Sequence, residues 1–318
     1  MRVVYFGSGD FAVPTLRWLV NSRHELPLVV TQPDRPAGRG KALQPTPVAL
    51  QAAEEGVETL KCENVNTPEI VQRLADLRAD IGVVAAFGQK LLEPLRSVFP
   101  LGCINLHASL LPKFRGAAPI NAAILAGETK TGVTVFRLVD RMDAGPILLK
   151  RETAIGSSEV AGELHDRLAG ICCDAIGAAL DLLEREPGYA GEPQDESQVT
   201  IARKLKKSDG DLDFTRPAEY LARQTRAMWP WPAARCRYVP ADGGKPVELA
   251  VITATAVPVD AAEAPGTITS VLTVATGQGT LEIHSVQPAG SRAMTWQAFV
   301  NGRHVRPGDR LEKIGQED

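Results

Sequence analysis

The sequence predicts an α/β protein with an N-terminal doubly wound, Rossmann-like parallel sheet domain and a C-terminal small β-barrel domain of the OB type. The first half alternates short apolar runs with amphipathic stretches, a pattern typical of strands and helices wound into a parallel sheet. Beyond Asp213 the pattern changes to short β runs separated by glycine-containing turns, which is typical of a small barrel or sandwich. A length of 318 residues suits two domains of ordinary size.

The elements of the first half follow from the spacing of their apolar residues. The expected strands are Arg2–Phe6, Pro27–Thr31, Asp80–Ala86, Cys103–Leu106 and Val133–Val139. The expected helices are Phe11–Val20, Pro47–Glu55, Pro68–Ala75 and a long one from about Ser158 to Glu184. Ligands of such sheets bind at the carboxyl ends of the strands, so the residues after Phe6, Ala86 and Leu106 are candidates for a site.

The composition shifts after the long helix. Residues 186–193 are rich in proline and glycine, which end a helix and are typical of a linker. We therefore expect an α/β domain over residues 1–186, a linker over 187–207 and a barrel domain over 208–318. The β runs expected in the barrel are Ala233–Val239, Val247–Ala254, Gly266–Val274 and Thr280–Val286.

Composition and charge exclude several classes of protein. The formal net charge is −3, so the overall charge does not by itself call for nucleic acid. The five cysteines are odd in number, scattered and without C-x-x-C spacing, which argues against a disulfide framework and a zinc knuckle. The chain opens directly on an expected strand, and no apolar stretch approaches the roughly 20 residues that span a bilayer. We expect a cytoplasmic protein with no membrane contact.

A glycine turn follows the first strand. Gly7-Ser8-Gly9-Asp10-Phe11-Ala12 fits the loose dinucleotide fingerprint G-x-G-x-x-A, which also requires an acidic residue at the end of the second strand. Asp34 is the available residue, and it lies in a proline-rich turn rather than at a strand tip. The sequence therefore favours a turn that lets the helix pack on the sheet, and we expect no NAD.

Two basic segments are candidates for contact with phosphate. The loop of residues 32–41 is stiffened by two prolines and carries Arg35, Arg39 and Lys41, close to the expected active edge of the sheet. Lys204, Lys206 and Lys207 lie in a basic cluster at the domain junction. Alternatively, both segments are ordinary charged surface exposed to solvent.

The residue types with the clearest chemistry follow the fourth strand. Asn105 and His107 are two residues apart in a strand, so their side chains point to the same side. Asp143 follows a further expected strand. An amide, an imidazole and a carboxylate together suit addition to a carbonyl, because donors can hold the developing oxyanion while the carboxylate manages protons.

Two other kinds of site fit these residues less well. A metal site would need a second His or a Cys nearby, so we expect no metal. A hydrolytic triad with Ser109 as nucleophile would need a G-x-S-x-G elbow, which is absent. A structural role for a single His near a strand end stays open.

At these residues the sequence resembles the folate-dependent formyltransferases and, among them, the methionyl-tRNA formyltransferases. The resemblance covers nearly the whole chain. It rests on residues 105–112 with 115–120, on Asp143-Ala144-Gly145-Pro146, on the loop 32–41, on Trp229-Pro230-Trp231-Pro232 and on residues 287–294. One departure is Arg141, because Gly-Met or Gly-Leu more often precedes the aspartate in the family.

The resemblance implies transfer of the formyl group of 10-formyltetrahydrofolate to the α-amine of methionine on initiator methionyl-tRNA, by a protein that we expect to be a monomer. Asn105 and His107 would stabilise the tetrahedral oxyanion, and Asp143 would orient His107 and move the proton through water. The folate would be lined mainly by backbone groups, at Phe87, Gly88, Ser109, Leu110, Leu111, Pro112, Val139 and Asp140. The tRNA would be held by Arg35, Arg39, Lys41, Lys204, Lys206 and Lys207.

Two alternative functions remain at this point. A formyltransferase acting on a small amine, such as an amino sugar nucleotide, would not need the stiff basic loop and the junction lysines. A catalytically silent module that binds folate or RNA would be expected to lack one of Asn105, His107 and Asp143, and all three are present.

Overall fold

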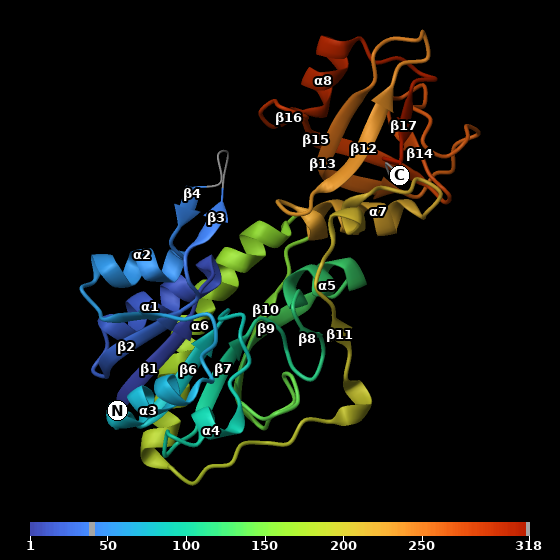
Figure 1. Cartoon of the computed structure of the whole chain (residues 1–318). Helices are drawn as coiled ribbons and strands as arrows, with labels where there is room; N and C mark the ends of the chain where they lie inside the picture. Colours follow the sequence, from blue (N-terminus) through green and yellow to red (C-terminus); the bar gives the residue numbers. More distant parts are fainter. Residues whose placement is uncertain (38–41, 316–318) are drawn as a thin grey trace. The chain divides into compact units, whose positions relative to one another are not determined.

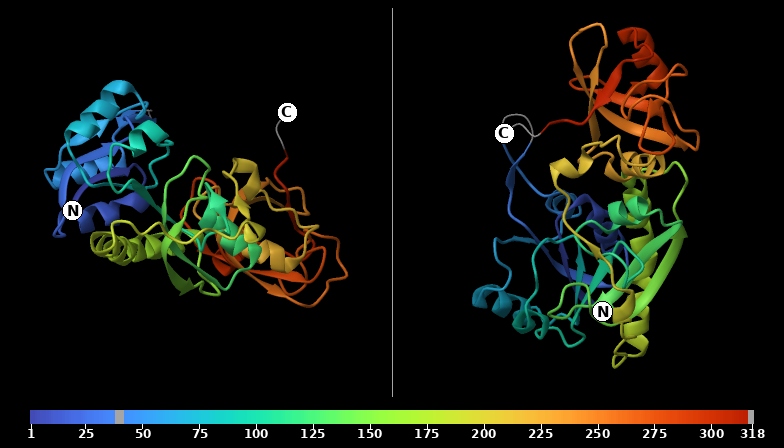
Figure 2. Two further views of the ribbon diagram at one scale, coloured as in Figure 1. Left: turned by 90° about the horizontal axis from the view of Figure 1, so that it is seen from below. Right: turned by 90° about the vertical axis from the view of Figure 1, so that its right-hand side faces the viewer.

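The computed structural model describes residues 1–37 and 42–315, and its contacts divide the chain into two compact units (Figures 1 and 2). Unit 1 comprises Met1–Pro119, Lys130–Ala154 and His165–Ala202. Unit 2 comprises Ile120–Thr129, Ile155–Leu164 and Arg203–Asp318. Residues 187–202, which the sequence places in a linker, thus have their contacts mainly in unit 1. The predicted domain limits remain a prediction.

Unit 1 is built on a seven-stranded sheet. Its strands are β1 Arg2–Gly7, β2 Glu25–Thr31, β5 Thr59–Lys61, β6 Ile81–Ala85, β7 Cys103–His107, β9 Lys130–Arg137 and β10 Ile147–Ala154. Their order is β10-β9-β7-β6-β1-β2-β5, as labelled in Figure 1. The four pairings β5–β2, β2–β1, β1–β6 and β6–β7 are all parallel, which confirms the predicted doubly wound core.

The edge formed by β9 and β10 departs from the all-parallel prediction. β9 pairs antiparallel with β7, and β10 pairs antiparallel with β9, so the two strands form a hairpin instead of a helical crossover. Leu138, the first residue of the hairpin loop, donates its N–H to the carbonyl of Cys103 at 2.8 Å. The loop therefore leaves β9 beside the start of β7, and it has to fold back to bring any of its residues to the end of that strand.

Helices cover both faces of this sheet (Figure 1). They are α1 Val13–Val20, preceded by a 3-10 turn at Asp10–Ala12, α2 Pro47–Glu54, α3 Pro68–Asp76, α4 Glu93–Arg96 and α6 Ala161–Arg185. Leu74 of α3 and Leu95 of α4 belong to one apolar cluster with Val4 and Phe6 of β1. On the opposite face Tyr5 is fully buried, and its hydroxyl donates to the carbonyl of Ala12 at 2.6 Å. All helices predicted for this half are confirmed within a few residues, and α4 was not predicted.

Three short elements complete unit 1. β3 Arg35–Ala37 lies within the predicted basic loop and pairs antiparallel with β4 Ala42–Gln44, which follows that loop. β8 Arg115–Gly116 pairs in parallel with β11 Ile201–Ala202, and a 3-10 turn lies at Glu196–Gln198. These pairs place ordered backbone in two segments that the sequence treats as loop and linker.

Unit 2 contains a nearly closed antiparallel barrel with the order β14-β15-β13-β12-β17. Its strands are β12 Ala234–Val239, β13 Val247–Val257, β14 Val274–Ala275, β15 Thr280–Pro288, β16 Met294–Thr295 and β17 Arg310–Glu312. Residues 266–268 bond to β17 on one side and to β14 on the other, which closes the ring. The barrel prediction is confirmed, but the expected strand Gly266–Val274 is broken into this bridge and β14.

Helices that the sequence did not predict accompany the barrel. They are α5 Pro119–Ala126, α7 Ala218–Met228 and α8 Trp296–Arg303, with a 3-10 turn at Lys207–Gly210. Thr295 caps α8 by accepting a hydrogen bond from the N–H of Ala298 at 3.2 Å. α7 buries Leu221 and Met228 and contacts β13 most extensively, so it packs on the barrel.

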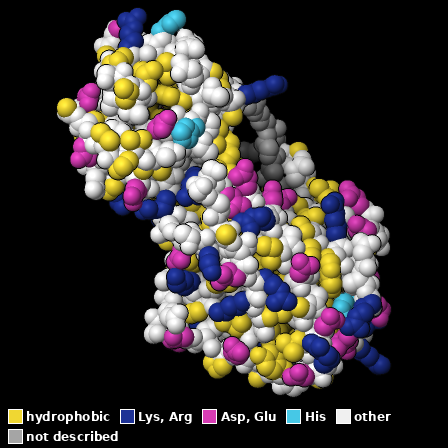
Figure 3. Space-filling view, turned by 180° about the vertical axis from the view of Figure 1, so that it is seen from behind, with side chains coloured by type: hydrophobic (Ala, Val, Ile, Leu, Met, Phe, Trp, Pro, Cys, Tyr) yellow, Lys and Arg dark blue, Asp and Glu magenta, His cyan; other side chains and the backbone are white. Residues whose placement is uncertain are grey.

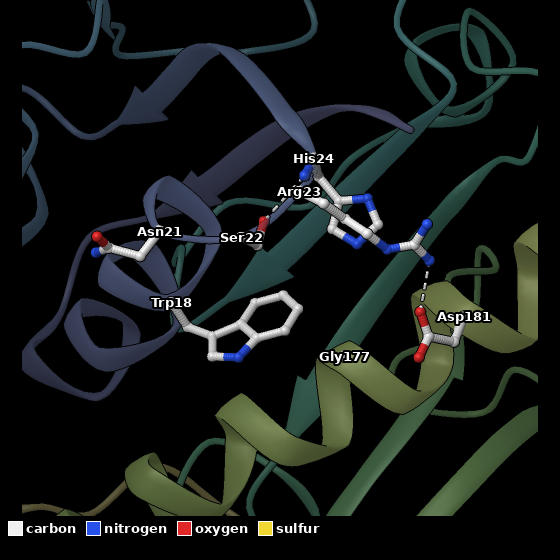
Figure 4. Close-up of a pocket in the computed structure, with 7 residues that line it drawn as sticks. All are labelled: Trp18, Asn21, Ser22, Arg23, His24, Gly177 and Asp181. Carbon is white, nitrogen blue, oxygen red and sulfur yellow. Dashed lines mark hydrogen bonds and ion pairs between the residues drawn. The ribbon is translucent and has the colours of Figure 1, made fainter.

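One cavity of unit 1, about 320 Å³ in volume, lies between the α1–β2 connection and α6 (Figure 4). Trp18 of α1 and Arg23 of the α1–β2 connection line it on one side, and Asp181 of α6 lines it on the other. Arg23 donates to Asp181 at 2.7 Å, so these charges already neutralise one another. The cavity lies before the start of β2, away from the carboxyl ends of the strands where this class of sheet binds ligands.

The surface mixes both signs of charge. On the face drawn in Figure 3, Lys and Arg side chains are interspersed with Asp and Glu side chains. This agrees with a net charge of only −3. None of the described helices is both long enough and apolar enough to span a membrane.

Candidate active site

Strand β7 carries Asn105 and His107 on one side of the sheet, near its carboxyl end. Asn105 lies opposite Val84 of β6 and Phe136 of β9, and His107 lies opposite Thr134. His107 is only 6% exposed, whereas Asn105 is partly exposed. The side-chain amide of Asn105 makes no hydrogen bond to any other described residue. It is therefore available to a ligand.

The ring of His107 is oriented by a backbone carbonyl. Its Nε2 lies 2.9 Å from the oxygen of Phe114, which can only accept a hydrogen bond. Nε2 must therefore carry a proton, and Nδ1 is the ring nitrogen left for chemistry. Nδ1 lies 3.7 Å from Oδ2 of Asp143, beyond hydrogen-bond range but close enough for the charges to interact.

Asp143 reaches His107 because the β9–β10 loop folds back. Asp143 has a left-handed backbone, with φ of +48°, and its Oδ2 accepts the N–H of Gly116 at 2.8 Å. Gly145 allows the fold, since a Cβ there would lie 1.7 Å from the carbonyl oxygen of Arg137. The sequence predicted that Asn105, His107 and Asp143 act together. The structure brings Asp143 of the β9–β10 loop to 3.7 Å from His107, and Asn105 shares strand β7 with His107.

Several of the residues expected to line a folate pocket have structural contacts of their own. Ser109 and Leu111 are fully buried, and Phe87 is 2% exposed. The hydroxyl of Thr134 donates to the carbonyl of Ser109 at 2.6 Å, and the N–H of Leu111 donates to that hydroxyl at 3.1 Å. The carbonyl of Phe87 accepts the side-chain amide of Gln32 at 2.8 Å. The hydrogen bonds of Phe87, Ser109 and Leu111 hold the backbone in place. These three residues can contact a ligand only through backbone atoms that are not already bonded.

Other residues of that set are better placed to meet a ligand. Gly88 and Val139 are exposed, and Val139 and Asp140 make no backbone hydrogen bond within the described part of the chain. The carboxylate of Asp140 pairs with Arg96 at 2.9 Å, and this hydrogen bond holds the pKa of Asp140 below its ordinary value. Leu110 is partly exposed and Pro112 is buried. Val139 and Asp140, whose backbone groups are unbonded among the described residues, belong to the same β9–β10 loop as Asp143.

The chain matches the family model of the formyl transferases over residues 1–176 and that of their C-terminal domain over residues 204–304. It belongs to the formyl transferase family. It is 44% identical over 319 aligned residues to a methionyl-tRNA formyltransferase of Methylococcus capsulatus, covering 98% of this chain and 99% of that one. A methionyl-tRNA formyltransferase of Methylobacillus flagellatus is 42% identical, with 98% and 99% covered.

Solved structures support the fold of this formyl transferase. The sugar 3N-formyl transferase WlaRD superposes with a TM-score of 0.65 at 14% identity, covering 92% of this chain and 99% of that one. HypX from Aquifex aeolicus in complex with tetrahydrofolic acid gives a TM-score of 0.58 at 14% identity, covering 94% and 47%. At these identities the likeness concerns the fold alone.

The basic residues expected to hold tRNA fall into three groups in this formyl transferase. Arg39 and Lys41 lie outside the described residues. Arg35 is exposed on β3 and pairs with Glu63 at 2.8 Å. Lys204, Lys206 and Lys207 are exposed, and no ion pair among the described residues involves them.

The glycine turn after β1 is already used by the protein backbone. The N–H groups of Ser8 and Gly9 both donate to the carbonyl of Ala86 at 3.2 Å. Asp34 pairs with Lys61 at 2.6 Å. The groups that a dinucleotide would need are thus engaged elsewhere. The described residues contain no cluster of three or more His, Cys, Asp or Glu side chains that could hold a metal.

Sequence reasoning missed the groups that orient His107 and Asp143 in this formyl transferase. Phe114 and Gly116 act through backbone atoms, and Gln194 lies in the segment interpreted as a linker. The resemblance quoted Arg115 and Gly116 without assigning them a role. The motif of residues 115–120 thus marked this segment as part of the family pattern. It did not specify which backbone atom would contact His107 or Asp143.

Proposed function

We propose that this formyl transferase transfers the formyl group of 10-formyltetrahydrofolate to the α-amine of methionine on initiator methionyl-tRNA. The observation that carries the proposal is the convergence of Asn105, His107 and Asp143 near the carboxyl end of β7. Full-length similarity to methionyl-tRNA formyltransferases supports the acceptor. A folate as the formyl donor suits this site, because uncharged backbone donors and acceptors can match the edge of its pterin ring.

The reaction begins when the methionine amine attacks the formyl carbon, forming a carbon–nitrogen bond and a tetrahedral oxyanion. The Asn105 amide donates a hydrogen bond to this oxygen. His107 donates from Nδ1 once that atom is protonated, while Nε2 keeps its bond to Phe114. Oδ2 of Asp143 lies 3.7 Å from Nδ1.

Proton transfer completes the exchange. The attacking nitrogen loses a proton, which Asp143 accepts through water with the carboxylate oxygen that Gly116 does not hold. The bond between the formyl carbon and N10 of the folate breaks as the oxyanion collapses, and N10 takes up one proton. The products are N-formylmethionyl-tRNA and tetrahydrofolate.

The tRNA is bound through basic residues of both units. Lys204, Lys206 and Lys207 offer exposed ammonium groups to phosphates, and the loop of residues 32–41 adds Arg35, Arg39 and Lys41. Arg203 differs from its neighbours because Asp209 takes both of its terminal nitrogens at 2.7 and 2.6 Å. Arg39→Ala is expected to raise the Michaelis constant for tRNA and to leave that for folate unchanged.

An amino sugar nucleotide is the second candidate acceptor, because the fold is shared with a sugar 3N-formyl transferase. Steady-state kinetics with a fixed concentration of 10-formyltetrahydrofolate separate the two. We expect methionyl-tRNA to be formylated with a kcat/KM far above that for an amino sugar nucleotide or free methionine, and uncharged tRNA to give no product. Preference for the amino sugar would overturn the proposal.

A further inference from the structure

Part of the segment that joins the two matched family regions is hydrogen-bonded around the candidate active site. The family models end at residue 176 and resume at residue 204, so this segment lies outside both. After the end of α6 at Arg185, it is drawn in Figure 1 as the coil that leads to β11 beside β8. Glu192 exchanges two backbone hydrogen bonds with Ile147, both 2.8 Å. Ala202 accepts the N–H of Ala117 at 2.8 Å. We call residues 192–202 the strap.

Gln194 is the part of the strap that holds the loop of Asp143. Its Nε2 donates to the backbone carbonyls of Asp143 and Gly145, both at 2.8 Å. Its Oε1 accepts from Nε and an NH2 group of Arg115, at 3.0 and 2.8 Å. Both amide hydrogens and both lone pairs of the oxygen are therefore in use. Arg115 is only 2% exposed, so this contact is shielded from water.

Thr200 is the residue of the strap that holds Phe114, whose carbonyl is hydrogen-bonded to His107. Its Oγ1 accepts the N–H of Phe114 at 2.8 Å, and its carbonyl accepts the N–H of Arg115 at 2.9 Å. The carbonyl of Phe114 is the group that orients His107. Gly116 lies against the strap, because a Cβ there would be 2.5 Å from the carbonyl oxygen of Ala202. The same short strand thus connects the strap to both catalytic side chains.

Arg141 adds an outer contact at the site where the chain departs from the family pattern. It pairs with Glu196 at 2.6 Å, and Glu196 also pairs with Arg115 at 2.8 Å. The Arg141 and Glu196 side chains are 66% and 51% exposed. An exposed pair of this kind is weakened by water and salt and contributes little to stability. The shielded contacts of Gln194 are therefore the stronger part of the attachment.

We propose that the strap sets the geometry of catalysis, with Gln194 and Thr200 as positioning residues for Asp143 and His107. This inference rests on the proposed function, because it assigns a task to the contacts of those two catalytic groups. A passive linker would need to cover distance and exclude water. It would not need a side-chain amide that makes four hydrogen bonds, two of them to the loop of Asp143.

Matched variants separate positioning from stability. Gln194→Glu keeps oxygens for Arg115 and loses both N–H donors to the Asp143 loop. Thr200→Val loses the oxygen that Phe114 uses, and Thr200→Ser restores it. Gln198→Glu is the control, because Gln198 lies on the same strap and its side-chain amide donates only to Asp195.

We expect Gln194→Glu and Thr200→Val to lower kcat by about ten- to a hundredfold, since small misplacements have effects of this size. The Michaelis constants for folate and tRNA should stay within about twofold, because neither residue contacts substrate in the proposed mechanism. Thr200→Ser and Gln198→Glu should retain wild-type kcat. Unchanged kcat in Gln194→Glu and Thr200→Val would overturn the proposal, and so would equal losses in the control.

A second readout keeps this test independent of the acceptor. The imidazole of His107 can be followed by NMR titration, and it is one of five histidines. The proposal predicts that Gln194→Glu and Thr200→Val move the His107 signals while Gln198→Glu does not. If the wild type failed to formylate methionyl-tRNA, the proposed function would fail, and the NMR shifts would still decide on the strap. Unmoved signals in both variants would contradict it.

Discussion

His107 and Asp143 face one another across 3.7 Å without a hydrogen bond between them. Each is oriented by a separate backbone group, His107 by the carbonyl of Phe114 and Asp143 by the N–H of Gly116. The pair therefore differs from a triad in which a carboxylate holds the imidazole directly. The gap leaves Nδ1 of His107 and the second oxygen of Asp143 free to act on substrate and water.

The first prediction concerns the groups that stabilise the oxyanion. Asn105→Ala removes one donor, and such a loss typically lowers turnover by about 10²- to 10³-fold. His107→Ala should lower it at least as much. Folate affinity should change far less than turnover, because both groups act mainly on the transition state. Near-normal turnover in either variant, measured under saturating substrates, would remove the assignment.

The second prediction concerns the charge of Asp143. Asp143→Asn keeps an oxygen that can accept the N–H of Gly116, so the loop should keep its place. The variant loses the negative charge beside His107 and the base that accepts the proton. Activity at neutral pH should therefore fall steeply while the unfolding temperature changes little. Wild-type activity across the pH range would make Asp143 a structural turn residue.

The third prediction concerns the exposed lysines of unit 2. Each phosphate contact releases counterions, so log affinity falls with log salt by roughly 0.7 to 0.9 per contact. Lys206→Ala combined with Lys207→Ala should flatten the slope for tRNA by about one to two units. Folate binding should not change. A slope equal to that of the wild type would assign both lysines to ordinary solvated surface.

The fourth prediction concerns stability at low pH. The hydrogen bonds from Arg203, and to a lesser degree from the backbone of Lys206, hold the pKa of Asp209 below its ordinary 3.8. The folded state thus binds this proton less readily than the unfolded chain. The stability contributed by Asp209 is present above the unfolded pKa and is lost as pH falls through the folded one.

Thermal unfolding measured between neutral pH and about pH 3 tests this. Asp209→Asn should lower the unfolding temperature at neutral pH and should reduce its dependence on pH in the acidic range. Asp195→Asn is a comparison, because Asp195 has a lowered pKa from contacts with Ser197 and Gln198 and lies in the strap instead. An Asp209→Asn curve parallel to that of the wild type would contradict the prediction.

The sequence was informative wherever local pattern decides structure. The apolar runs at β1, β2, β6 and β7 predicted the parallel core, and the spacing of Asn105 and His107 predicted one shared face. The antiparallel hairpin of β9 and β10 was missed, because an apolar run carries no mark of its direction. Direction depends on the loop of residues 138–146, whose course is set by the close approach of Gly145 to Arg137.

The contacts that orient His107 and Asp143 could not be predicted from the sequence, because they too depend on tertiary structure. Phe114 and Gly116 contribute atoms that every residue has, so their identity carries no signal for His107 or Asp143. Gln194 follows a proline- and glycine-rich stretch, and its partners are 49 or more residues away in the chain. Local composition described this segment as a linker, and only tertiary contact reveals the amide at its centre.

Tracing the formyl carbon tests the central claim most directly. The enzyme is mixed with methionyl-tRNA and 10-formyltetrahydrofolate labelled at the formyl carbon, and the amino acid is released by ester hydrolysis and identified by mass spectrometry. We predict labelled N-formylmethionine from the wild type, and about 10²- to 10³-fold slower appearance with Asn105→Ala. Methionine released without the label, under conditions where an amino sugar nucleotide becomes labelled, would contradict the account.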